Sequence, residues 1–261
     1  LSGCDLCVLL ASADIRRASK ALVFGVALNA GRTCIAPRTS LVHRSIFERA
    51  TSQLTQAFDA MAALHVPDTR DTIRARRWIA DALQRGAVAL GAHDPLSQWP
   101  VLLTGVPRRH PLRTEDVFAP VLCVDAFEQL DDVLAVASDS EFALGMSIFG
   151  EESEARALAA QANVGCVCIN DVIAPTADPR VPFSGRRSSG YGVTRGAEGL
   201  LEMTQVKPIV TQRSRSPLHL RRARQNDFSL LLAWTGLAHS RAQDRWTHLK
   251  QLLQSLRGHH D

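Results

Sequence analysis

Short apolar runs alternate with stretches of helical apolar spacing over the first 170 residues. The apolar runs are too short for buried helices and are typical of buried strands. They predict strands at residues 6–10, 39–43, 88–90, 101–106, 121–127, 146–149 and 166–170. Helices are predicted between them at residues 13–28, 46–64, 71–85, 130–137 and 153–162. This alternation favours an α/β fold of stacked layers with a largely parallel sheet.

The pattern changes after residue 174. Residues 175–195 are rich in Gly, Pro, Ser and Arg, which predicts a long irregular and functional loop. Order returns at residues 200–210, where 206–211 read as a strand, and residues 213–224 read as a basic linker. Residues 241–257 predict an amphipathic helix, whose apolar face comprises Trp246, Leu249, Leu253 and Leu256.

Composition and charge restrict the class of protein. With 261 residues, 46% of them apolar and 21% charged, the chain fits one large soluble domain with an appendage. It begins at Leu1 without a signal-peptide pattern, so we expect a fragment or processed product of a cytoplasmic protein. Nine Lys or Arg against three Asp or Glu from Thr211 onward account for the net charge of +4. The body is near neutral, and we therefore expect no nucleic-acid partner.

Cys34 is the first candidate for chemistry. It lies between a predicted helix and a predicted strand, after Gly31 and between Arg32 and Arg38, whose charges favour a thiolate. A thiolate can attack a carbonyl carbon. Pairing with a histidine, as in cysteine proteases, stays open, although no motif supports it.

The other cysteines are Cys4, Cys7, Cys123, Cys166 and Cys168. The pairs at 4 and 7 and at 166 and 168 lie in apolar, strand-like runs, whereas zinc ligands usually lie on turns. We expect reduced, buried thiols and no metal site.

Four motifs occur in an order that resembles the aldehyde dehydrogenase superfamily. The segment around Cys34 (NAGRTCIAPR) resembles its cysteine signature, with Arg32 in place of the usual Gln. Residues 1–5 (LSGCD) resemble the stretch that follows its general-base glutamate, and residues 115–121 (EDVFAPV) its Glu-Glu-Ile-Phe-Gly-Pro-Val motif. Residues 182–192 (PFSGRRSSGYG) resemble its Pro-Phe-Gly-Gly segment. The likeness extends to about residue 210.

The resemblance implies a three-layer open, twisted sheet and a mechanism. Cys34 would attack an aldehyde, hydride would pass to NAD or NADP, and water activated by a glutamate would hydrolyse the thioester. Asp116 falls where the family binds the nicotinamide ribose hydroxyls, and Phe118 where an aromatic ring packs beside that ribose. Catalytic Cys34 and cofactor-binding Asp116 and Phe118 are therefore the predicted site.

Several parts of the family site fall outside these residues. The resemblance places the base glutamate one position before Leu1, and the oxyanion asparagine and most of the nucleotide site further upstream. Cys4, Ala119 and Ser184 replace the family's Lys, Gly and Gly. We therefore expect the isolated chain to be inactive as a dehydrogenase.

These observations predict three segments. Residues 1–200 form the catalytic domain, residues 201–212 a strand that resembles the family's oligomerisation strand, and residues 213–261 a basic linker with a helical tail. We expect a homo-oligomer, a dimer or tetramer. The tail helix would dock on the body or a partner subunit, or else lie on an anionic membrane surface. The alternatives to an NAD(P)-dependent aldehyde dehydrogenase are a non-catalytic assembly module and a relative that passes the acyl group to coenzyme A.

Overall fold

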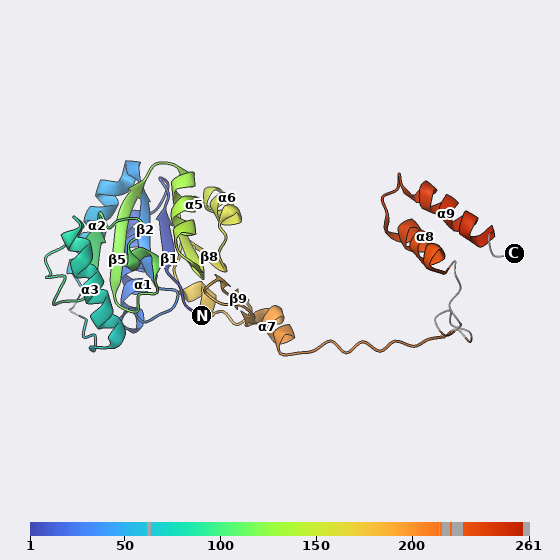
Figure 1. Ribbon diagram of the computed structural model, residues 1–261. Coiled ribbons are helices and arrows are strands. Elements are labelled where there is room, and N and C mark those ends of the chain that lie inside the picture. Colours follow the sequence, from blue (N-terminus) through green and yellow to red (C-terminus); the bar gives the residue numbers. More distant parts are fainter. Residues whose placement is uncertain (62–63, 214, 216–219, 221–226, 258–261) are drawn as a thin grey trace. The chain divides into compact units, whose positions relative to one another are not determined.

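A seven-stranded sheet forms the centre of residues 1–205 in the computed structural model, which describes residues 1–61, 64–213, 215, 220 and 227–257 (Figure 1). The strand order is β3-β4-β5-β2-β1-β7-β8, and only β3 runs antiparallel to its neighbour. The strands of this sheet are β1 (Asp5–Leu9), β2 (Pro37–His43), β3 (Val88–Leu90), β4 (Val101–Thr104), β5 (Val121–Phe127), β7 (Gly145–Phe149) and β8 (Cys166–Ile169).

Helices cover both faces of the sheet. The helices of this unit are α1 (Ile15–Ala27), α2 (Phe47–Asp59), α3 (Arg70–Gln84), α4 (Pro111–Thr114), α5 (Leu130–Asp139), α6 (Glu152–Gln161) and α7 (Gly196–Glu202). On one face, α1 and α2 pack against alternate residues of β1, β2, β4, β5 and β7. On the other, α3 packs over β4 and β5, and α5 and α6 pack over β1 and β7. The predicted three-layer α/β fold with a largely parallel sheet is confirmed.

Short elements complete the unit. Three 3₁₀ turns, η1 (Leu28–Gly31), η2 (Arg44–Ile46) and η3 (Ala174–Ala177), lie in the connections. Two small ribbons pair β6 (Phe142–Ala143) with β10 (Arg186–Arg187), and β9 (Phe183–Ser184) with β11 (Val193–Thr194). The segment predicted to be irregular, 175–195, is therefore tied down by three of these two-residue strands.

The carboxyl-terminal residues form a second unit, Val206–Asp261. Within it, α8 (Asp227–His239) and α9 (Arg245–Arg257) pack against each other. The linker predicted at 213–224 lies mostly outside the described residues. Apolar side chains remain exposed on both helices, namely Phe228, Leu231, Leu232, Trp234, Trp246 and Leu253. In the described part of the chain, no helix combines the length and apolar character needed to cross a membrane.

Two sequence predictions in this region differ from the structure. Residues 206–211 adopt no regular structure, because a strand needs a partner and none of the described residues pairs with this segment. Pairing of this segment with a second copy stays a prediction. The helix α8 was not predicted, since its apolar residues surround it and leave no 3.6-residue period.

Candidate active site around Cys34

Four segments meet at the amino ends of the parallel strands. Residues before β1, β2 and β5 carry Gly3, Cys34 and Phe118 respectively, and β7 follows directly after Leu144. A Cβ atom on Gly3 would lie 2.7 Å from the Cys34 carbonyl oxygen. A Cβ on Gly31 would lie 2.3 Å from the Pro120 nitrogen, and Gly31 has a φ of +74°. These two glycines let the Cys34 loop touch both neighbouring segments, which side chains would separate.

The Cys34 loop has an unusual backbone. Asn29 and Ala30 both have positive φ values, 53° and 52°, which cost energy in residues with a side chain. A turn then follows, closed by the Ala36 N–H donating to the Thr33 carbonyl at 3.1 Å. Cys34 lies at the tip of this turn and is half-buried. The strained approach and the turn together place Cys34 just before the amino end of the central strand β2.

Arg38, in β2, holds the Cys34 loop through hydrogen bonds. Its side chain is 1% exposed, and its guanidinium donates to the carbonyl oxygens of Gly31 and Ala119, both at 2.7 Å. A third bond reaches the Thr33 carbonyl at 3.3 Å. Burial lowers the pKa of Arg38 to about 10, against the opposing influence of Cys4, Asp5, Asp116 and Cys34. Arg38 thus supplies a buried positive charge near Cys34 and ties its loop to the segment before β5.

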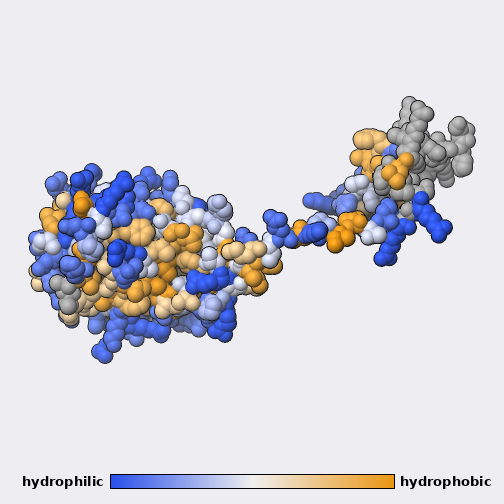
Figure 2. Space-filling model, turned by 90° about the horizontal axis from the view of Figure 1, so that it is seen from below, coloured by the Kyte–Doolittle hydropathy of each residue, from blue (hydrophilic) through white to orange (hydrophobic). Residues whose placement is uncertain are grey.

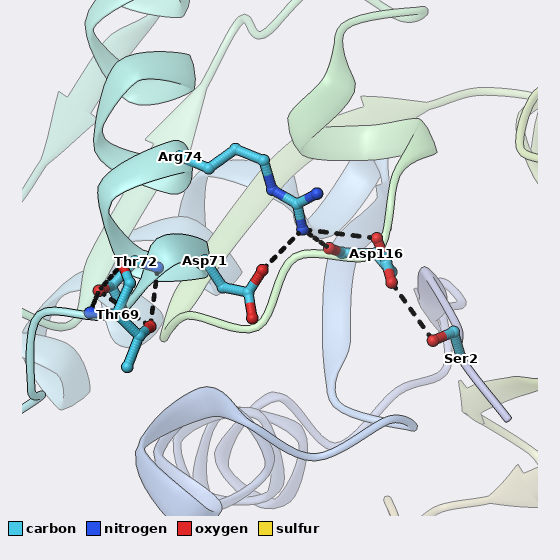
Figure 3. A network of polar contacts seen from close by, with 6 residues as sticks. All are labelled: Ser2, Thr69, Asp71, Thr72, Arg74 and Asp116. Atoms are coloured by element: carbon cyan, nitrogen blue, oxygen red, sulfur yellow. Dashed lines mark hydrogen bonds and ion pairs between the residues drawn. The ribbon is translucent and has the colours of Figure 1, made fainter.

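Asp116 lies on that segment, in a small polar network (Figure 3). Its carboxylate accepts a hydrogen bond from the Ser2 hydroxyl at 3.3 Å and lies 3.6 Å from the Arg74 guanidinium. Arg74, on α3, also donates to the Asp116 carbonyl at 3.0 Å and pairs with Asp71 at 3.1 Å. The Asp116 side chain remains 28% exposed, so part of its carboxylate is open to solvent.

The structure brings the segment of Cys34 against the segment that carries Asp116 and Phe118. Phe118 is half-buried and lies one residue before Ala119, whose carbonyl is bonded to Arg38. Figure 2, which views the molecule from below in Figure 1, shows apolar side chains spread across the middle of this surface of residues 1–205, with polar ones along its upper and lower margins. Large contiguous apolar patches on a protein surface often mark sites that bind a ligand or another protein surface.

The remaining thiols of the amino-terminal half differ from Cys34 in their surroundings. Burial raises the pKa of Cys4 and Cys7, and raises that of Cys123 to about 12. The Cys4 thiol donates to the Arg113 carbonyl at 3.0 Å. These three thiols stay protonated at neutral pH, which makes them poor nucleophiles.

Sequence reasoning missed a buried carboxyl group beside the site. Asp5 begins β1, is 6% exposed and accepts a hydrogen bond from the Gly145 N–H at 3.1 Å. Desolvation raises the pKa of Asp5 to about 7, and the Gly145 bond and Arg38 oppose the rise. The sequence feature that could have identified Asp5 is an acidic residue directly before the apolar run of a predicted strand. Ser2 and Arg74 were missed too, since nothing local in sequence marks them.

We expect Asp5 to make the fold less stable as the pH rises. Below about pH 4 the carboxyl is protonated in both states, whereas between about pH 4 and 7 only the native state keeps the proton. The free energy of unfolding should therefore fall through this range, by up to about 4 kcal/mol. Asp5→Asn keeps an acceptor for Gly145 and cannot ionise. Urea unfolding across this pH range should show wild type losing stability relative to Asp5→Asn, and parallel curves would contradict the prediction.

Comparisons with known proteins complete the description of the site. The family model described as "Aldehyde dehydrogenase family" matches residues 1–209. A 4,4'-diapolycopene aldehyde oxidase from Methylomonas sp is 31% identical over 228 residues, which cover 83% of this chain and 43% of that protein. A probable NADP(+) succinate-semialdehyde dehydrogenase from Synechocystis sp. is 30% identical over 80% of this chain and 49% of its own length. The chain spans about half the length of the curated relatives it matches.

Solved structures show the same likeness. An NAD-dependent aldehyde dehydrogenase from Sinorhizobium meliloti superposes with a TM-score of 0.76 at 25% identity, over 84% of this chain and 46% of that one.

Proposed function

The chain belongs to the aldehyde dehydrogenase family, and from this premise we propose that residues 1–205 are the catalytic portion of an NAD(P)-dependent aldehyde dehydrogenase with Cys34 as nucleophile. The observation that carries this proposal is the meeting of the Cys34 turn with the Asp116–Pro120 segment through Gly31 and Arg38. Two residues of that segment, Asp116 and Phe118, are the ones that the resemblance assigns to the nicotinamide ribose, which supports a role for Cys34 beside the bound nucleotide.

The chemistry assigned to Cys34 follows from its position. Its thiolate attacks the aldehyde carbon, and the backbone N–H of Cys34 donates to the oxyanion of the thiohemiacetal that forms. Such a donor contributes about 3 kcal/mol to lowering the barrier. The Arg38 bonds to the Gly31 and Thr33 carbonyls keep the turn in place. Cys34 then carries the acyl group as a thioester until it is hydrolysed.

The residues present fit a nicotinamide nucleotide. A carboxylate has about four acceptor sites, and Asp116 uses some of them toward Ser2 and Arg74 while its side chain stays 28% exposed. Asp116 would therefore accept from ribose hydroxyls, and the half-exposed Phe118 ring would pack beside the ribose. The bound nucleotide supplies the hydride acceptor, and the protein supplies its position.

A complementation experiment tests this function. We expect purified residues 1–261 to give no turnover, because the resemblance places the base glutamate and most nucleotide contacts outside these residues. Joining them behind the amino-terminal half of an aldehyde dehydrogenase should give NADH or NADPH with some member of a panel of aldehydes. A folded hybrid that forms neither product across the panel would instead favour a non-catalytic assembly module. Robust NADH formation by residues 1–261 alone would refute the expected inactivity.

We expect Asp116→Ala to lower kcat/KM of the active hybrid by about 10- to 100-fold, the effect of losing one or two hydrogen bonds to a charged group. The KM for the nucleotide should account for much of the loss. Asp71→Ala is the matched control, because Asp71 also pairs with Arg74 but lies on α3, outside the Asp116–Pro120 segment (Figure 3). Equal losses in both variants would show that Asp116 acts only by holding Arg74.

A further inference from the structure

Two thiols lie side by side on the edge strand of the sheet, outside the chemistry assigned to Cys34. Cys166 and Cys168 begin and nearly end β8, which among the described residues pairs with β7 alone. Residues two apart on a strand point to the same face. Both side chains line one small cavity, together with Asp5, Ile35 and Phe183. Cys166 is half-buried, whereas Cys168 is buried.

The two thiols are electrostatically unequal. Their mutual hydrogen bond lowers the pKa of Cys166, and the Arg195 charge lowers it further; Arg195 lies 5.0 Å above the Phe183 ring. The same bond, burial and the charges of Cys166, Asp171 and Asp5 raise the pKa of Cys168. Cys166 is thus the more acidic of the two thiols, and Cys168 is the one that keeps its proton more firmly.

We propose that Cys166 and Cys168 form a redox modification site, in which a peroxide oxidises Cys166 and Cys168 then closes a disulfide with it. The Cys166 sulfur attacks one peroxide oxygen, the O–O bond breaks, and sulfenic acid and hydroxide form. The Cys168 sulfur attacks the sulfenic sulfur and loses its proton, the S–O bond breaks, and water leaves. Two electrons pass from the sulfurs to the peroxide, which ends as two waters once the hydroxide is protonated.

The spacing permits the bond. Cα atoms two residues apart on a strand are about 6.6 Å apart, within the upper part of the range that disulfides span. Their Cβ atoms must approach to about 4 Å, so the bond requires a local contraction of β8. An edge strand with one free side can contract locally with the loss of few ladder bonds. By contrast, the Cys4–Cys7 pair has the spacing of many redox motifs, yet Cys7 is buried, and the half-buried Cys4 donates to the Arg113 carbonyl. Desolvation raises the pKa of both thiols. The structure therefore favours Cys166 and Cys168 as the redox pair, although the sequence spacing alone would favour Cys4 and Cys7.

The site can be tested in the full chain carrying Cys34→Ser, which removes the competing nucleophile and leaves β8 intact. After graded hydrogen peroxide, iodoacetamide labelling and trypsin, the peptide of residues 157–180 contains only these two cysteines. We expect it to lose two hydrogen atoms and its labelling, and dithiothreitol to restore both. The peptide of residues 1–16, with Cys4 and Cys7, is the internal control and should stay reduced.

Two further variants assign the roles. In Cys168→Ala we expect the reaction to stop at a Cys166 sulfenic acid that dimedone traps, and in Cys166→Ala we expect Cys168 to stay unmodified. Full labelling of peptide 157–180 at peroxide concentrations that oxidise Cys34 in the parent chain would overturn the proposal. So would sulfenic acid on Cys168 in place of Cys166. The first measurement needs no substitution in β8, and none of these outcomes depends on aldehyde oxidation.

Discussion

Replacing Cys34 with alanine should lower aldehyde oxidation by the active hybrid by about 10⁴-fold or more, the order of loss when an acyl-forming nucleophile is removed. The reason is chemical, since without sulfur there is no thiohemiacetal from which hydride can leave. The fold should survive, because Cys34 is half-buried at the tip of a turn and the bonds that hold the turn come from Ala36 and Arg38. Steady-state NADH formation and the thermal unfolding midpoint measure the two effects separately.

Cys123→Ala is the matched control for Cys34. Cys123 is fully buried in β5, where its high pKa makes it a poor nucleophile. Its replacement should cost some stability and leave kcat nearly unchanged. In wild type, iodoacetamide should label Cys34 well before Cys123. Comparable labelling rates, or a Cys34→Ala hybrid that retains a tenth of its activity, would remove Cys34 from the nucleophile's role.

The architecture could be predicted because local patterns carried it. Most central strands, such as β1 and β5, are largely apolar runs, and Asp14 caps α1 through its bond to the Arg17 N–H, as a helix-start residue does. The prediction failed where no local pattern existed. The helix α8 has no apolar period, and residues 206–211 have strand-like composition but no partner strand within the described part of the chain.

In the candidate site, too, local motifs identified some residues, whereas contacts between distant positions could not be predicted. Cys34, Asp116 and Phe118 could be named from motifs, because each lies in a short run that resembles the family. The contacts that organise them join distant positions: Arg38 bonds Ala119 across 81 residues, and Arg74 bonds Asp116 across 42. The sequence alone indicated only that Arg38 brings a positive charge near a thiol. The structure shows that Arg38 also joins the Cys34 turn to the Asp116–Pro120 segment, a role called the clamp below. Arg32, proposed for the same charge, is exposed and bonds weakly to the Asn29 carbonyl at 3.4 Å.

Arg38→Met should therefore have the largest effect of any single change on the loop. It leaves the Gly31, Thr33 and Ala119 carbonyls without their donor, and each unsatisfied buried acceptor costs about 1–3 kcal/mol. Removing a costly buried charge offsets part of this loss, which leaves an expected decrease of about 3–5 kcal/mol in the free energy of unfolding. Urea unfolding measures this decrease, and the iodoacetamide rate at Cys34 reports the accompanying release of the turn.

Arg32→Met distinguishes the effect of the Arg38 hydrogen bonds from the effect of its charge. It removes one positive charge close to Cys34 without removing any of the Arg38 bonds. An exposed residue with one weak bond should change stability by no more than about 0.5 kcal/mol and leave Cys34 labelling nearly unchanged. Arg38→Lys keeps the charge but cannot reach Gly31 and Ala119 with a planar fork, so it should recover only part of the stability. If Arg38→Met and Arg32→Met lost equal stability, or if Arg38→Lys behaved as wild type, charge alone would explain Arg38. The clamp between the Cys34 turn and the Asp116–Pro120 segment would then have to be abandoned.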